Sequence, residues 1–208
     1  MNDILVVDNI INRELQDKIK NIMLGTKFPW FFLRDMSHPD VGNEHNYNTP
    51  KDISEYTLTK TRPCSKHMFL ENGKVVSPYY KDLLPIMNNS AEYIKKNVVH
   101  IEQIRAFLQY PLSEKVYEVD KIDPPHIDIH IPHTVFLYYV CDGDGNTVFY
   151  DYVSKSKDDK PYMKNLKVIK ELEPIQGRVV IFNGLRWHSP GFPKKNVRSI
   201  LNFDVQCK

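Results

Sequence analysis

The second half of the chain is dominated by short segments with the composition of β-strands, and no helical pattern separates them. These segments are rich in Val, Ile, Phe and Tyr and are bounded by Pro, Gly, Asn and Asp. They cover residues 104–110, 115–119, 134–140, 147–153, 166–172, 178–182 and 197–205. Parallel strands would need helical crossovers between them, so this order predicts an antiparallel sandwich or barrel. The expected form is a jelly roll, which leaves a cavity between two sheets.

The first hundred residues carry helical patterns instead. Apolar residues at helical spacing predict a helix that follows an N-cap at Asn12 and ends at Gly25. Ser77-Pro78 is expected to begin a second helix, Pro85 to break or kink it, and a further helix to run to about Asn97. Helices of this half are expected to cover one outer face of the jelly roll.

A hairpin is expected at residues 67–76, around Asn72-Gly73. The length of 208 residues suits one core. We therefore expect a single domain, 1–208, with a helical support region at 1–100 and a jelly-roll core at 101–208.

Composition excludes several classes of protein. The net charge of +2 does not indicate the basic groove of a nucleic-acid-binding protein. No segment approaches the roughly 20 apolar residues of a membrane span, and the short apolar run at the N-terminus does not resemble a signal peptide. Three widely spaced cysteines are typical of free thiols in a reducing compartment. These features predict a cytoplasmic protein with no membrane partner.

The strand at 197–205 has two different faces. One row consists of Val197, Ser199, Leu201, Phe203 and Val205, and the other contains Arg198, Ile200 and Asn202. We expect the first row to pack on helices and the second to line the cavity. A buried arginine there would need an anion.

Three residues form a candidate metal site. His126 and Asp128 are two positions apart, so on a strand both side chains can reach one ion. His188 lies in a later strand that a jelly roll can bring alongside. Two imidazoles and one carboxylate can hold Fe(II) on one face and leave the opposite face open. The alternative is a surface pair beside the Pro124-Pro125 turn.

Arg198 is the candidate anchor for a dicarboxylic co-substrate, because its guanidinium can pair with a carboxylate through two hydrogen bonds. With the metal site, this arginine suggests an oxygenase that uses iron and 2-oxoglutarate. Tyr139 could add a hydrogen bond to the same carboxylate, and Tyr110 could reach the metal end of the co-substrate. For both tyrosines the alternative is ordinary core packing.

Other candidates are interpreted as structural. His130 and His133 compete as ligands, but Pro132 favours a turn in which both are solvated. Arg105 is placed outside the cavity, and Trp187 is interpreted as a packing residue. The polar segments 34–52 and 154–165 are candidate substrate lids or plain insertions.

From about residue 104 to 205 the chain resembles the iron/2-oxoglutarate-dependent dioxygenases of the prolyl 4-hydroxylase type. The matching stretches are PPHID at 124–128, HTVFLYYVCDGDGNTVFYD at 133–151, GRVVIFNGLRWHSPGF at 177–192 and RSILNFDV at 198–205. The whole length, with FPWFF at 28–32 and SPYY at 77–80, is similar to small members from marine viruses and bacteria. One departure is Cys141-Asp142, where the pattern often has asparagine.

The resemblance implies a mainly β fold with flanking helices, the cupin-like double-stranded β-helix. It implies that His126, Asp128 and His188 bind Fe(II) and that Arg198 anchors 2-oxoglutarate, with Tyr139 and Tyr110 at further co-substrate positions. Dioxygen would be the second co-substrate, and ascorbate is a further candidate cofactor. An iron halogenase is disfavoured because Asp128 occupies the carboxylate position.

The predicted activity is hydroxylation of a prolyl or other protein side chain, with succinate and carbon dioxide as co-products. One alternative is a hydroxylase of a free amino acid, small metabolite or nucleobase. Another is a non-catalytic cupin-like metal-binding module, which would have no need of a buried Arg198.

Overall fold

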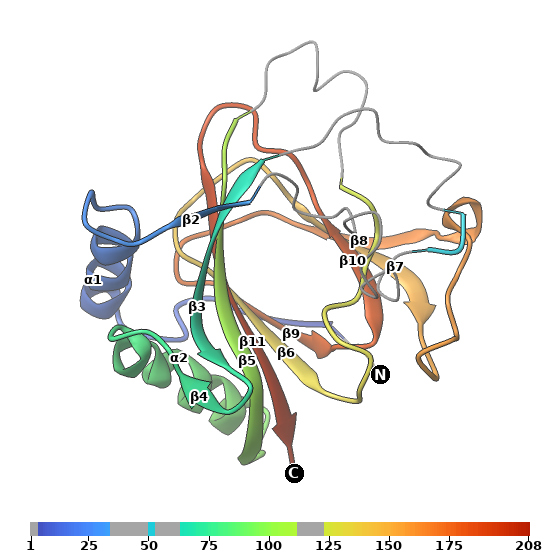
Figure 1. Ribbon diagram of the computed structural model, residues 1–208, viewed down its shortest axis with the longest axis horizontal. Coiled ribbons are helices and arrows are strands. Elements are labelled where there is room, and N and C mark those ends of the chain that lie inside the picture. Colours follow the sequence, from blue (N-terminus) through green and yellow to red (C-terminus); the bar gives the residue numbers. More distant parts are fainter. Residues whose placement is uncertain (1–3, 34–49, 53–62, 112–122) are drawn as a thin grey trace.

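The computed structural model describes residues 4–33, 50–52, 63–111 and 123–208. In this part of the chain, two helices lie on one side of a large antiparallel sheet and a small antiparallel sheet faces its other side (Figure 1). The predicted jelly roll with flanking helices is confirmed.

The first strands are β1 (Ile4–Val7), β2 (Phe31–Leu33), β3 (Cys64–Glu71), β4 (Lys74–Val75) and β5 (Val98–Gln109). The later strands are β6 (Thr134–Tyr139), β7 (Thr147–Val153), β8 (Val168–Leu172), β9 (Val179–Asn183), β10 (Arg186–Pro190) and β11 (Arg198–Cys207). The helices are α1 (Arg13–Met23), α2 (Tyr80–Tyr93) and a single 3₁₀ turn at Met163–Asn165.

The large sheet has the strand order β1-β9-β6-β11-β5-β3-β2, with β4 paired to β3, and the small sheet has the order β10-β7-β8. The predicted hairpin is present as β3 and β4 around Asn72-Gly73, both of which have a positive φ. The strand expected at 115–119 lies outside the described residues.

The first hundred residues contribute more than helical support. Strands β1 to β4 all belong to the large sheet, where β1 forms one edge and β2 the other. The sheet that carries the jelly-roll core is therefore built from both halves of the chain.

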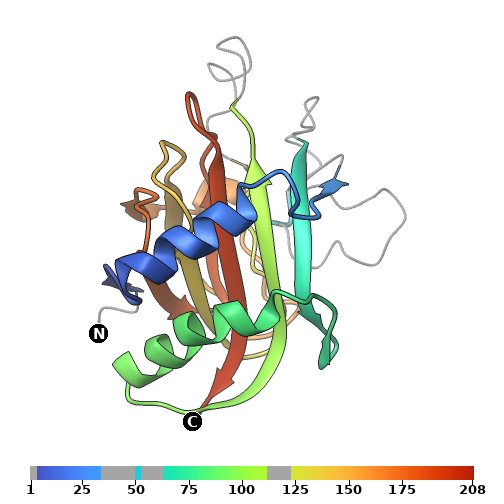
Figure 2. The same ribbon diagram turned by 90° about the vertical axis from the view of Figure 1, so that its left-hand side faces the viewer.

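The central strand β11 separates two apolar cores, as its alternation predicted. Leu201, Phe203 and Val205 pack with residues of α1 and α2 in the core between helices and sheet. Ile200 faces the other way and packs with residues of β6, β7 and β9 between the two sheets. Figure 2 shows both helices lying across the outer face of the large sheet.

Helix α1 begins as predicted, because the side chain of Asn12 accepts a hydrogen bond from the backbone N–H of Leu15 at 2.9 Å. Of the two effects predicted for Pro85, a break is wrong, since α2 runs through Pro85 as one helix, whereas a kink stays a prediction. A proline removes one backbone hydrogen bond, whereas Leu83, Ile86 and Met87 are all buried on this helix. That apolar burial outweighs the loss.

None of the helices in the described part of the chain combines the length and the apolar character that a membrane span requires. Cys64, Cys141 and Cys207 form no disulfide bond.

Replacing Asn12 by alanine is expected to lower the free energy of unfolding by about 1 kcal/mol, because the first turn of α1 loses its side-chain acceptor. Chemical denaturation monitored by circular dichroism measures the change. Asn21→Ala, on the exposed side of the same helix, is the matched control. An equal loss in both variants would show that the cap is not responsible.

Candidate metal centre

The two candidate histidines are joined by their own backbones. His126 forms an antiparallel bridge with His188, in which His126 N–H donates to the His188 carbonyl at 2.9 Å and His188 N–H donates back at 3.1 Å. Directly bridged residues of antiparallel segments project to the same side, and the two ring centroids are 4.7 Å apart. The fold therefore brings together imidazoles that are 62 positions apart in sequence.

Asp128 completes the group. Its Oδ1 lies 3.9 Å from His126 Nε2 and its Oδ2 lies 3.8 Å from His188 Nε2. One ligand atom from each of these three residues lies within 4.8 Å of the other two. This spacing suits three ligands of one metal ion. The side chains of Asp128 and His188 are 5% exposed and that of His126 is 23% exposed. Solvent therefore reaches the group mainly on the side of His126.

Both oxygens of Asp128 accept hydrogen bonds from the large sheet. Arg105 on β5 donates to Oδ1, and Asn202 on β11 donates to Oδ2 at 2.9 Å. These two residues are direct partners in the register of β5 and β11. The carboxylate is therefore held in place from the sheet side, while the histidines approach it from the other.

The prediction that Arg105 lies outside the cavity is wrong. Its neighbours Ala106 and Ile104 are fully buried against the helices, so the alternation turns Arg105 and Phe107 toward the small sheet. On both β5 and β11, the apolar side of the strand packs against the helices and the polar side lines the site. The same reasoning applied to both strands would have found Arg105.

Electrostatics favour ligand-competent forms of all three residues. Burial lowers the pKa of His126 to about 4 and also lowers the pKa of His188, so both rings are neutral near pH 7 with a lone pair to donate. For Asp128, burial acts to raise the pKa, but the charge of Arg105, the two histidines and the Asn202 hydrogen bond together lower it well below its usual range. The carboxylate is therefore ionised.

A second group lies behind the first and shares Asp128 with it. Asp128, His133 and Asp204 also bring one ligand atom each within 4.8 Å of the others. Burial, followed by the charge of Asp128, raises the pKa of Asp204 to about 8, so its carboxyl is protonated near pH 7. Arg105 lies 3.7 Å from it. A protonated acid beside a guanidinium is a poor cation site, so the first group is the better candidate.

The prediction that His133 is a solvated turn residue is wrong. Its side chain is fully buried, with Nδ1 at 2.7 Å from the Ile131 carbonyl and Nε2 at 3.6 Å from Asp204 Oδ1. A Cβ at Gly184 would lie 1.9 Å from His133 Nε2, so only glycine leaves room for the ring. His130 lies in a bend, as predicted, but both of its ring nitrogens are buried, so the prediction that this ring is solvated is also wrong.

Arg198 lies where the alternation predicted, buried on the inner face. It is 1% exposed. Its guanidinium donates to the Gly145 carbonyl at 2.8 Å, to Gln109 Oε1 at 2.8 Å and to Thr147 Oγ1 at 2.7 Å. All three acceptors are neutral, and no described residue forms an ion pair with Arg198. A buried cation with only neutral partners favours the binding of an anion.

The two candidate tyrosines differ. The ring of Tyr139 lies 5.7 Å from the Arg198 guanidinium, and its hydroxyl donates to Thr147 Oγ1 at 2.6 Å, so the structure brings Tyr139 to Arg198. Tyr110 is 40% exposed and its hydroxyl is 2.7 Å from Ser65 Oγ. Within the described residues, no contact joins Tyr110 to the triad or to Arg198, and its co-substrate role stays a prediction.

Two further residue assignments concern the small sheet. Trp187 is a packing residue as predicted, fully buried among Ile127, Val148, Tyr150 and Leu185. Hydrogen bonds anchor the segment 154–165 to the rest of the protein. Ser154 Oγ accepts one from Trp187 Nε1 at 2.9 Å, and Met163 N–H donates one to Asp52 Oδ1 at 2.7 Å. Its role as a lid stays a prediction, and most of segment 34–52 lies outside the described residues.

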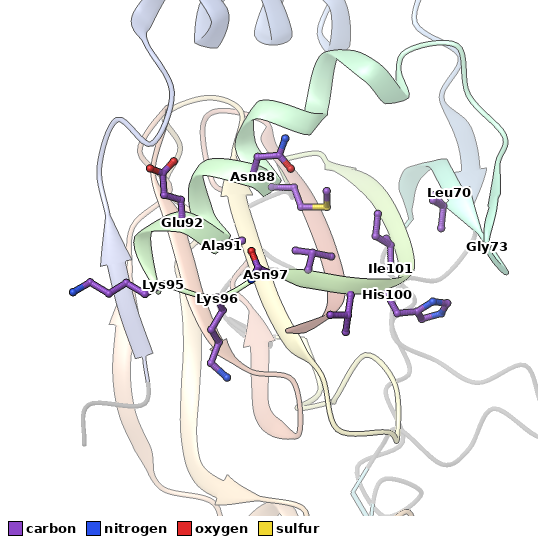
Figure 3. A pocket seen from close by; sticks show the side chains of 13 residues that line it. Leu70, Gly73, Asn88, Ala91, Glu92, Lys95, Lys96, Asn97, His100 and Ile101 are labelled. Atoms are coloured by element: carbon purple, nitrogen blue, oxygen red, sulfur yellow. The ribbon is translucent and has the colours of Figure 1, made fainter. Parts of the chain in front are cut away.

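A separate pocket of about 980 Å³ lies on the helix side of the large sheet. Figure 3 shows side chains from α2, from the turn at Lys95-Lys96 and from the start of β5 around it. None of the triad residues lines this pocket. It is distinct from the candidate metal centre.

Several residues of the site were not singled out from the sequence. Gln109 and Thr147 hold Arg198, and Asp204 lies behind Asp128. Asp204 continues the row of Arg198, Ile200 and Asn202 on β11, so alternation carries the signal for it. Thr147 begins its strand and has no such signal, because its contact depends on how the two sheets face each other.

Comparison with solved structures decides the fold. An oxidoreductase of the 2OG-Fe(II) oxygenase family from Burkholderia pseudomallei matches with a TM-score of 0.62 and 10% identity, over 98% of this chain and 85% of that one. The chain has the fold of the 2-oxoglutarate-dependent Fe(II) oxygenases. The sequence matches no protein-family model and no curated protein.

Two other structures with this oxygenase fold show its range. A prolyl hydroxylase in complex with a hypoxia-inducible factor peptide, from Trichoplax adhaerens, matches with a TM-score of 0.59 and 11% identity, over 99% of this chain and 84% of that one. The α-ketoglutarate-dependent carbocyclase SnoK of nogalamycin biosynthesis matches with a TM-score of 0.61 and 7% identity, over 98% and 79%. The structural similarity establishes the oxygenase fold, and identities this low leave the substrate open.

Gly184→Ala is expected to cost about 1–3 kcal/mol of stability, because the new methyl group overlaps the buried ring of His133. Thermal and chemical denaturation measure the loss. Gly143→Ala is the matched control, since the nearest atom to its Cβ would be 3.4 Å away. In a His133→Ala background the Gly184 substitution should cost much less, and an equal cost in both backgrounds would exclude this steric explanation.

Proposed function

We propose that this protein is an Fe(II)/2-oxoglutarate-dependent dioxygenase that hydroxylates an organic substrate. The observation that carries the proposal is the pairing of two features on one inner surface. One is a His-Asp-His group with ligand atoms within 4.8 Å of one another. The other is a buried arginine with neutral partners only. A metal-binding module without co-substrate would need the first feature and not the second.

The residues fit the cofactor that the fold implies. His126, Asp128 and His188 would hold Fe(II), since two neutral imidazoles and an ionised carboxylate are the ligand set of non-heme Fe(II) oxygenases. When bound with 2-oxoglutarate, the iron supplies the oxidising chemistry, in which dioxygen is reduced, 2-oxoglutarate becomes succinate and carbon dioxide, and a substrate C–H bond is hydroxylated.

The chain's own residues provide orientation and shielding. Arg198 binds the distal carboxylate of 2-oxoglutarate, with Tyr139 beside it. Arg105 and Asn202 orient Asp128 through its two oxygens, as outer hydrogen bonds orient metal ligands in general. The rings of Phe149 and Phe182, centred 6.1 and 5.1 Å from that of His188, shield this imidazole from water.

The substrate is less constrained than the cofactor. We propose a prolyl or other protein side chain as the first candidate, which is supported by the prolyl hydroxylases among the structural neighbours. The carbocyclase and an epimerase of nogalamycin biosynthesis share the fold and support the second candidate, a free small molecule. Ascorbate is a further candidate cofactor.

Asp128→Ala is expected to weaken Fe(II) binding by more than about 100-fold and to abolish succinate formation, because the metal loses its only charged ligand. Metal titration by calorimetry and succinate release measure the two effects. Asp158→Ala, at an exposed position, is the matched control. Undiminished succinate formation by Asp128→Ala would defeat the proposal.

Arg198→Lys is expected to raise the KM for 2-oxoglutarate by on the order of tenfold to a hundredfold, because an ammonium cannot form the paired hydrogen bonds of a guanidinium. Lysine keeps the charge, and the melting temperature shows whether the variant folds. Arg178→Lys, which alters a surface ion pair with Asp8, is the matched control. An unchanged KM would remove Arg198 from this role.

A further inference from the structure

Two cations line the inner face of the large sheet beside the candidate metal centre. Lys66 on β3 is the direct partner of Phe107 on β5, and Arg105 lies two residues before Phe107 on the same face. The Arg105 guanidinium lies 5.4 Å from the centre of the Phe107 ring. Lys66, Phe107 and Arg105 therefore form one continuous patch of the wall, here named the cationic wall.

The side chain of Lys66 has no countercharge at ion-pair distance in the described part of the chain. Its side chain is half-buried, and none of the described residues forms an ion pair with it. Burial lowers the pKa of Lys66, and the nearby charge of Arg105 lowers it further, while Glu71 and Cys64 act in the opposite direction. A half-buried ammonium without a partner costs free energy that a bound anion would offset.

Arg105 lacks a full complement of partners as well. Its Nη2 donates a hydrogen bond to Asp128 and lies 3.7 Å from Asp204. Its buried Nε–H has no acceptor among the described residues. A metal ion bound to Asp128 would neutralise part of the negative charge that the carboxylate now presents to Arg105. The positive charge of the cationic wall would then be less compensated than in the metal-free protein.

We propose that the cationic wall binds a carboxylate of the primary substrate, and that this substrate is a free amino acid or another small carboxylic acid. The inference rests on the proposed function and selects the second of its two substrate candidates, the free small molecule, over the first. Arg198 lies farther along β11, opposite Gln109, where neutral acceptors surround it. The inner face therefore offers two anion sites, one for the co-substrate at Arg198 and one for the substrate at Lys66 and Arg105.

A backbone amide within a protein substrate carries no charge and would leave the cationic wall without a partner. A site whose buried donors stay unpaired binds such a ligand much more weakly than one that supplies the missing acceptor. The chemistry of the wall thus disfavours an internal prolyl residue.

Calorimetry on the protein loaded with Mn(II) and 2-oxoglutarate tests the proposal without turnover. The ligands are the twenty L-amino acids, their amides, and prolyl peptides blocked at both ends. At least one free acid is expected to bind tenfold or more tighter than its own amide. Blocked prolyl peptides that bind as tightly as the free acids, amides that bind as tightly, or a failure of every acid to bind would each overturn the proposal.

Lys66 is the residue to vary, because none of its contacts involves the triad, whereas Arg105 touches Asp128. Lys66→Met is expected to reduce the preference for acid over amide at least fivefold, and Lys66→Arg to restore it. Lys74→Met, on the exposed hairpin strand β4, should retain the preference. An acid preference that survives Lys66→Met would assign the carboxylate to another site.

The loading step separates the two proposals. If Mn(II) and 2-oxoglutarate do not bind, the proposed function fails and this inference falls with it. If both bind and no acid preference appears, only the substrate class is wrong.

Discussion

The alternation of side chains along β11 is the constraint on which both the fold and the site depend. One row of this strand, with Leu201, Phe203 and Val205, forms part of the apolar surface against which the helices pack. The opposite row places Arg198, Asn202 and Asp204 on the inner face. A shift of one residue in the register would bury the polar row under the helices and expose the apolar row to the site. The register of β11 that buries its apolar row is therefore also the register that places its polar row at the site.

The polar row creates an electrostatic arrangement that an ordinary core would not tolerate. Asp128 is buried and ionised because the charge of Arg105 and the hydrogen bond from Asn202 stabilise its carboxylate. Asp204, a short distance behind, is protonated because the same surroundings cannot support a second negative charge. Arg198 is buried with neutral acceptors alone. Such arrangements, in which like groups are held in different charge states, are typical of functional sites.

Local patterns in the sequence predicted a large part of this structure. The strands at 134–140 and 147–153, the capped helix after Asn12 and the two faces of the last strand all follow from side-chain periodicity. Periodicity works here because each element packs one face against a core. The spacing His126-x-Asp128, together with His188 and Arg198 in later strands, likewise predicted groups that the fold brings onto one surface.

The errors arise where a distant contact decides the outcome. Arg105 alternates as expected, but which face of β5 meets the helices is set by the neighbouring strands. His133 is buried because Gly184, far along the chain, leaves space for its ring. Pro85 does not interrupt α2 because the sheet beneath provides the apolar surface that holds the helix. For His133 and Pro85 the local sequence carries no signal of these contacts, whereas alternation along β5 does carry one for Arg105.

The most direct test of the account is a crystal structure of the protein with Fe(II) and 2-oxoglutarate under anaerobic conditions, with anomalous diffraction at the iron edge. One iron peak is expected, coordinated by His126, Asp128 and His188, together with 2-oxoglutarate whose distal carboxylate lies on Arg198. Iron bound at Asp204 and His133 instead, or a co-substrate that leaves Arg198 with its neutral partners alone, would contradict it.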